Sequence, residues 1–239
     1  IRDSFKGLES KQKVGGFGHP PFFINPKNIK VMLQKANENE VIDFFEKSKR
    51  IEEAAKYYGL FLESLGFDYE ADPQTKDTPM RVAKAWVEDL VKGSMTEAPI
   101  ITTFPNEEHY NGIVIQTGIK VNSMCAHHNL PFYGYAAVAY LPEGNVIGLS
   151  KLNRIVDWFS RRPQMQESLT QQIHKYLSEK LQCASVAVSI SGHHLCCGMR
   201  GVQHPDSIMT TNKFSGNFLD SDNLIRDEFM NAIKMNNLN

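Results

Sequence analysis

Cysteine and histidine gather in two short clusters whose residue types suit a metal site. In residues 123–128, Cys125 and His128 are close enough along the chain to share one ion. Residues 193–197 follow about seventy positions later and contribute Cys196. Because cysteine and histidine are the usual ligands of zinc, the pattern predicts a zinc ion held by these three side chains.

Three protein ligands would leave the fourth tetrahedral position of zinc to water, as in catalytic zinc sites. Zinc lowers the pKa of such a water toward ~7, which makes hydroxide available at neutral pH. A His/Cys/Cys shell also serves the base deaminases, so the pattern indicates hydrolysis of a heterocycle. His127 and His194 each lie beside a predicted ligand, and we expect them to donate and accept protons.

Two other interpretations of these clusters remain open. The cysteines and histidines could be buried packing residues, and each of His127 and His194 could be an ordinary structural histidine. Alternatively, Cys197 could supply a fourth ligand, which would make the zinc structural instead of catalytic.

A second group of residues has the chemistry of an anion site. Ser150, Lys151 and Arg154 open a predicted helix, and Arg200 lies four residues beyond Cys196. Positions i and i+3 place Lys151 and Arg154 on one helix face beside a helix N-terminus, which favours phosphate. The alternative is a solvated basic helix start.

Glu167 follows Gln166 at the start of another predicted helix. Its carboxylate could simply complement the helix dipole. It could also accept two hydrogen bonds from the N–H edge of a guanine, a contact that adenine cannot reproduce.

These residues require a scaffold of mixed helices and strands. Helical spacing of apolar residues runs from about Asn39 to Gly66, and Asp77-Thr78-Pro79 opens a second helix. Segments rich in β-branched and aromatic side chains predict strands over 113–124, 133–141 and 186–191. Further helical patterns predict helices over 150–160, 166–181 and 225–233. Helices before, between and after antiparallel strands predict an α+β fold.

Composition limits the remaining possibilities. The 239 residues carry a net charge of −1, so no broad basic field would draw the chain to nucleic acid or anionic membranes. No apolar run approaches the ~20 residues that span a bilayer, and the first residues lack the apolar core of a signal peptide. We therefore expect a soluble protein of the reducing cytoplasm. Residues 1–40, with glycines and prolines at 15–21, predict a partly flexible extension before a catalytic domain over 41–239.

Long segments closely resemble the GTP cyclohydrolase I family, and the resemblance covers roughly residues 41–234. The matching segments are Thr78-Pro79-Met80-Arg81-Val82-Ala83-Lys84, Cys125-Ala126-His127-His128, Val146 through Ile155, Arg161-Arg162-Pro163-Gln164-Met165-Gln166-Glu167, His194-Leu195-Cys196 and Met199-Arg200-Gly201-Val202.

The resemblance implies a tunnelling fold (T-fold) over 110–239 after a helical part over 41–95. In that fold helices cover one face of an antiparallel sheet, and subunits join their sheets into barrels of a homodecamer with interfacial active sites. The site residues implied are Cys125, His128 and Cys196 for zinc, His127 and His194 for protons, Ser150, Lys151, Arg154 and Arg200 for the triphosphate with Arg81 and Lys84 from a neighbouring subunit, and Gln166 and Glu167 for guanine.

The implied reaction is attack of zinc-activated water on C8 of GTP, loss of that carbon as formate, and rearrangement to 7,8-dihydroneopterin triphosphate. This is the first step of tetrahydrofolate and tetrahydrobiopterin synthesis. The sequence leaves open which pathway is fed and whether a regulatory protein binds.

One position departs from the family pattern, which has glutamate where this chain has Ala126. A change beside a metal ligand can cost about 10- to 100-fold in metal affinity or activity. One rival hypothesis is therefore a weak or inactive relative that still binds zinc and nucleotide. Another is a zinc hydrolase for a different nucleotide, against which Glu167 and the phosphate cations argue.

Overall fold

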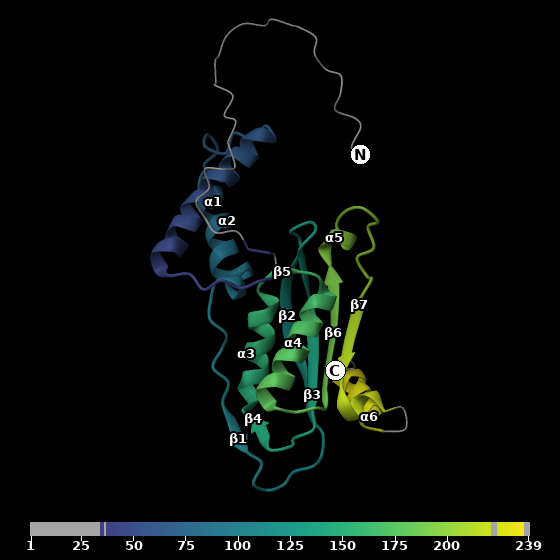
Figure 1. Ribbon diagram of the computed structural model, residues 1–239. Helices are drawn as coiled ribbons and strands as arrows, with labels where there is room; N and C mark the ends of the chain where they lie inside the picture. Colours follow the sequence, from purple (N-terminus) through teal and green to yellow (C-terminus); the bar gives the residue numbers. More distant parts are fainter. Residues whose placement is uncertain (1–33, 36, 221–223, 237–239) are drawn as a thin grey trace, which may run out of the picture. The chain divides into compact units, whose positions relative to one another are not determined.

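A five-stranded sheet forms the centre of the protein (Figure 1). The structure, a computed structural model, describes residues 34–35, 37–220 and 224–236. The strand order is β5-β2-β3-β6-β7, in which β5 pairs parallel to β2 and the other neighbours pair antiparallel. The strands are β2 (Val114–Cys125), β3 (Pro131–Tyr140), β5 (Pro163–Gln164), β6 (Val186–His194) and β7 (Met209–Phe214), and β1 (Thr103–Pro105) pairs separately with β4 (Asn145–Ile147).

The helices lie before, between and after the strands, which confirms the α+β prediction. They are α1 (Phe44–Ser64), α2 (Thr78–Lys84), the π-helical η2 (Ala85–Leu90), the 3-10 turn η3 (Lys92–Ser94), α3 (Leu149–Ser160), α4 (Gln166–Leu181), α5 (Leu195–Gly198), the 3-10 turn η4 (Gly216–Leu219) and α6 (Ile225–Asn236). Asp43 caps α1 by accepting a hydrogen bond from the Glu46 amide at 2.8 Å. Gly66, at φ +85°, follows the end of this helix, as its sequence position predicts.

The main core lies between the sheet and helices α3 and α4. Buried side chains recur at helical spacing in both helices, and they meet alternate residues of the strands; they are Leu152, Ile155, Val156, Phe159, Leu169, Ile173, Leu177 and Leu181, against Ala136, Val138, Tyr140, Val188 and Ile190. This packing fixes α3 and α4 on the sheet.

The other sheet face carries a smaller core. Ala137, Ala139 and Ala187 pack there against Phe218 of η4 and Phe229 of α6. The expectation that helices cover one face only is therefore wrong, because the apolar side of α6 shields the alanine-lined part of the second face. The rest of that face lines an open concavity of about 810 Å³ with Lys120 and Tyr135 among its walls.

Part of the predicted extension contacts the domain, while residues 1–33 and 36 lie outside the described part. The side-chain amide of Asn39 donates to the Gly93 and Thr96 carbonyls at 3.0 and 2.9 Å. Helices α1 and η2 share a third apolar cluster that includes Ile51 and Val87.

Within the described residues, no helix combines the length and apolar character needed to cross a bilayer.

His174 on α4 gives the fold a testable pH dependence. Its Nε2 lies 3.0 Å from Ser215 Oγ, and burial, with help from the charge of Lys213, lowers the pKa of the imidazole. Because the unfolded chain then binds a proton more readily, stability is complete above the ordinary histidine pKa of ~6.5 and is lost as pH falls through the lowered value.

We expect His174→Gln to flatten the fall in unfolding free energy below about pH 6.5 relative to the parent chain. Urea-unfolding midpoints measured from about pH 8 to 5 test this. Parallel curves for parent and variant would show that His174 does not contribute to the acid sensitivity.

Candidate metal centre and active site

The turn between β2 and β3 presents Cys125 and His128 together. The Cys125 amide donates to Leu130 O at 2.9 Å, and the Asn129 amide donates to Cys125 O at 2.8 Å. Asn129 adopts φ +52°, a left-handed conformation that asparagine tolerates better than most residues. The turn brings Cys125 Sγ within 4.0 Å of His128 Nδ1.

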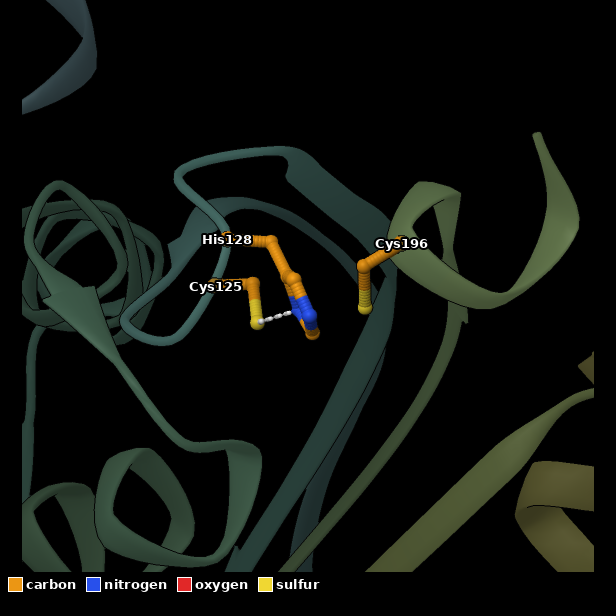
Figure 2. A group of neighbouring side chains, drawn as sticks. All are labelled: Cys125, His128 and Cys196. Atoms are coloured by element: carbon orange, nitrogen blue, oxygen red, sulfur yellow. Dashed lines mark hydrogen bonds between the residues drawn. The ribbon is translucent and has the colours of Figure 1, made fainter. Parts of the chain in front are cut away.

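Cys196 lies beside these two side chains but comes from a later segment of the chain. It lies on α5, directly after β6, and β6 pairs with β3 so that His194 lies opposite Phe132 near the turn. The ligand atoms of Cys125, His128 and Cys196 all lie within 4.8 Å of one another, and Figure 2 shows the three side chains converging. Two segments about seventy residues apart thus form one three-residue group.

This donor set fits a tetrahedral zinc ion. Zinc bonds of about 2.3 Å to sulfur and 2.0–2.1 Å to nitrogen place neighbouring ligand atoms roughly 3.5–4 Å apart, close to the spacing seen. Burial, with the thiols of Cys125 and Cys197 nearby, raises the pKa of the Cys196 thiol to about 11. A bound divalent cation opposes that effect because it stabilises thiolates.

Cys197 is the residue that would make the zinc structural. Its Sγ lies 4.0 Å from the Cys196 Sγ, and its side chain is exposed. Among the cysteine, histidine, aspartate and glutamate side chains of residues 34–35, 37–220 and 224–236, the grouping that could hold a metal comprises Cys125, His128 and Cys196 without it. The arrangement supports the three-ligand interpretation.

The two candidate proton-transfer histidines have different surroundings. His194 is half-buried, and its ring stacks on Phe132 with a centroid distance of 4.6 Å and an interplanar angle of 6°. Burial lowers the pKa of His194, and the charge of Glu167 partly opposes this. His127 is exposed on the turn, with its ring 6.4 Å from that of His128.

Gln166 and Glu167 begin α4 but point to different environments. Gln166 is 1% exposed, and its amide oxygen lies 2.9 Å from His194 Nε2. Both hydrogens of its amide nitrogen are engaged inside the chain, so the predicted guanine contact would rest on the amide oxygen alone. Glu167 is exposed and close enough to His194 to influence its pKa.

The predicted phosphate residues at the start of α3 lie away from the metal group. Asn153, beside them on the helix, accepts a hydrogen bond from Gln116 near the start of β2, whereas Cys125 ends that strand. The carbonyl of Arg162, just after α3, accepts from Ser123 at the Cys125 end of the sheet. The helix is about 18 Å long, so Ser150 and Lys151, in its first turn, lie at the opposite end, and Arg154 lies near its middle (Figure 1).

The other predicted phosphate residues, Arg200, Arg81 and Lys84, are exposed. Arg200 follows α5 and thus stays on the metal side of the sheet. Arg81 and Lys84 project from α2, where Arg81 forms a solvent-exposed ion pair with Asp77 at 3.3 Å. A single chain therefore does not bring all the predicted substrate residues together.

Sequence reasoning missed the contacts that hold His194. Phe132 and Gln166 reach His194 only through the β3–β6 register and the packing of α4 on the sheet. The available signal was weak: an apolar strand residue and a glutamine at a helix start are both common.

The chain is similar in sequence to known enzymes. The family model for GTP cyclohydrolase I matches residues 54–234. A GTP cyclohydrolase 1 from Sulfurihydrogenibium is 44% identical over 77% of this chain and 94% of its own length. Those from Flavobacterium johnsoniae and Bacteroides fragilis are 40% and 41% identical, each over 78% of this chain and over 83% and 95% of their own lengths.

The solved structure of an archaeosine synthase QueF-Like in the apo form is 16% identical, with a TM-score of 0.37 over 45% of this chain and 96% of that one. The family assignment does not rest on that structure. It rests on the GTP cyclohydrolase I family model, which spans residues 54–234, and on relatives above 30% identity across most of both chains. This chain belongs to the GTP cyclohydrolase I family of enzymes.

Proposed function

We propose that this chain hydrolyses GTP at C8 in a zinc-dependent reaction that releases formate and yields 7,8-dihydroneopterin triphosphate, the first step of tetrahydrofolate or tetrahydrobiopterin synthesis. The observation that carries the proposal is the convergence of Cys125, His128 and Cys196 within 4.8 Å, beside the half-buried His194. When bound, zinc supplies a Lewis acid that makes water nucleophilic at neutral pH.

The protein residues divide the remaining work. His194, oriented by Phe132 and Gln166, exchanges protons with the reacting ring, and exposed His127 is the second proton carrier. Glu167 accepts hydrogen bonds from the N1–H and exocyclic amine of guanine, because its carboxylate is exposed at the first turn of α4, close enough to His194 for its charge to act there. Stacking and burial hold His194 in one orientation before substrate arrives.

A second copy of the chain completes the site. Ser150, Lys151 and Arg154 lie in the N-terminal half of α3, away from the metal group, so the triphosphate they bind belongs to a GTP whose purine is held by another copy. Arg200 adds a cation on the metal side, and Arg81 and Lys84 approach from a neighbouring subunit, as the family resemblance implies. This arrangement supports an oligomer with interfacial sites, and we propose the homodecamer of joined sheets that the family resemblance implies.

The function is tested by incubating zinc-loaded protein with GTP while measuring formate and the absorbance of the pterin product. Stoichiometric formate and a growing pterin signal, both lost when zinc is chelated, are expected. Tight binding of zinc and GTP without either product would favour the rival hypothesis of an inactive relative.

Ala126 motivates a separate prediction about the rate. It is half-buried, follows the ligand Cys125, and its amide donates to Gln164 O at 3.2 Å. A carboxylate here would add hydrogen-bonding and negative charge next to the metal ligands, so we expect Ala126→Glu to raise kcat/KM for GTP by about 10-fold or more.

Formate release by parent, Ala126→Glu and the uncharged Ala126→Gln separates charge from size. A rise in the glutamate variant alone would assign the effect to the carboxylate. Equal rates in all three would show that this chain does not need a carboxylate at position 126.

A further inference from the structure

A hydrogen bond between Gln166 and His194 links the start of α4 to the end of β6. The Gln166 amide oxygen lies 2.9 Å from His194 Nε2. Gln166 is 1% exposed, so water does not compete for this bond. His194 lies two residues before the predicted ligand Cys196, which places the bond at the border of the metal centre.

The orientation of the Gln166 amide follows from its other partners. Its nitrogen lies 3.0 Å from Ile190 O, 2.9 Å from Met209 O and 3.1 Å from Thr211 Oγ1. Carbonyl oxygens can only accept, so the atom facing them must be the amide nitrogen. A flipped amide would set its oxygen against two carbonyl oxygens and its nitrogen against His194.

This orientation determines which nitrogen of His194 carries hydrogen. The amide oxygen of Gln166 can only accept, so Nε2 of His194 must donate, and the lone pair of the neutral ring is then on Nδ1. The stack on Phe132 at 4.6 Å holds the ring plane. Within the described residues, Nδ1 forms no hydrogen bond and is left for a ligand.

The local backbone leaves just enough room for this contact. A Cβ added to Gly192 would lie 3.2 Å from the Gln166 amide oxygen and 3.2 Å from Tyr133 O. That spacing is tighter than ordinary van der Waals contact, so the glycine lets the amide lie against β6.

We propose that Gln166 is a positioning residue that holds His194 with hydrogen on Nε2 and thereby leaves Nδ1 as the bare ring nitrogen available to the substrate. The inference rests on the proposed proton-transfer role of His194. It gives Gln166 a role different from the guanine contact expected from the sequence.

The tautomer is measured first, on the unaltered chain. Solid-state NMR of zinc-loaded protein labelled with 15N-histidine, at about pH 8 where an ordinary histidine with pKa ~6.5 is neutral, distinguishes protonated from bare ring nitrogens. The His194 signals are those missing from His194→Asn. Hydrogen on Nε2 is expected, and hydrogen on Nδ1 would overturn the proposal.

Kinetics then test whether the bond matters for turnover. We expect Gln166→Met to lower kcat by about 10- to 100-fold while KM for GTP changes little, because the side chain acts through His194 and not on the substrate. A raised KM with unchanged kcat would instead indicate a guanine contact and would overturn the proposal.

Gln164→Met is the matched control for stability. Gln164 is 2% exposed and its amide donates to Phe159 O and Ser123 Oγ, so the variant also removes a buried amide but leaves His194 untouched. If its kcat falls as far as that of Gln166→Met, loss of a buried amide explains the effect and the positioning role is refuted.

A double-mutant cycle separates this inference from the proposed function. If Gln166 acts through His194, adding Gln166→Met to His194→Asn costs nothing further in kcat. Additive losses with an impaired His194→Asn would refute the positioning role alone. A His194→Asn variant with normal kcat would refute the proton-transfer role of His194 and with it the catalytic part of the inference, while the NMR result still reports the tautomer.

Discussion

Cys196→Ser is expected to abolish both zinc retention and formate release. Cys196 supplies one of three candidate ligand atoms that lie within 4.8 Å of one another, and it is the candidate from the distant cluster of the sequence. A serine hydroxyl is harder and far less acidic than a thiol, so it does not replace a thiolate on zinc. Zinc per chain after gel filtration should fall from roughly one to near zero, with turnover reduced more than about 100-fold.

Cys197→Ser is the control for this experiment. Its exposed thiol lies 4.0 Å from that of Cys196 but does not belong to the three-residue group. Retained zinc and a near-normal rate in Cys196→Ser would refute the ligand assignment. Loss of zinc in Cys197→Ser, with far-UV circular dichroism showing an intact fold, would instead support a four-ligand structural site.

The helices and central strands could be predicted because their apolar residues follow clear periods. The spacing of Leu169, Ile173 and Leu177 reports both a helix and its buried face. Strand β7 was not predicted because Met209–Phe214 is largely polar and pairs with β6 alone. The shielding of the second sheet face by α6 also depends on tertiary packing, which no local pattern reports.

The convergence of Cys125, His128 and Cys196 could be predicted from residue types, since cysteine and histidine at short spacing near strand ends have few other uses together. Its surroundings could not. The Gln166–His194 bond depends on the register that puts His194 opposite Phe132 and on the depth at which α4 packs. Sequence presents Gln166 and Glu167 as an equivalent polar pair, but the fold buries the first and exposes the second.

The separation of the metal group from the start of α3 has a physical consequence for the proposed oligomer. Lys151 and Arg154 form no ion pair within the described residues. They leave positive charge on the N-terminal half of α3, away from Cys125. A triphosphate bound there would satisfy these charges. Joining two copies so that this surface faces a neighbour's metal group would assemble a nucleotide site that neither copy has alone.

Glu167→Gln is expected to remove most of the preference for GTP over ATP. The Glu167 side chain is exposed at the first turn of α4, next to the buried Gln166, and its charge reaches His194. A carboxylate can accept from both N–H groups of the guanine edge, whereas a carboxamide presents one donor that meets a guanine donor. Hydrogen bonds to a charged group contribute about 1.5–3 kcal/mol each, so kcat/KM for GTP should fall roughly 100-fold.

The purely structural interpretation, in which the charge of Glu167 only complements the α4 dipole, predicts a different effect of the substitution. Glu167→Gln would then cost only about 0.3–1 kcal/mol of unfolding free energy and would leave nucleotide preference unchanged. Glu167→Asp helps to separate the two, because it keeps the charge at the helix start but withdraws the carboxylate by one methylene. Inhibition of formate release by ATP, compared among the parent and both variants, is the measurement. If ATP competes with GTP no better in Glu167→Gln than in the parent, Glu167 does not contact the guanine. If ATP competes better in both variants, the position of the carboxylate, and not only its charge, selects the base.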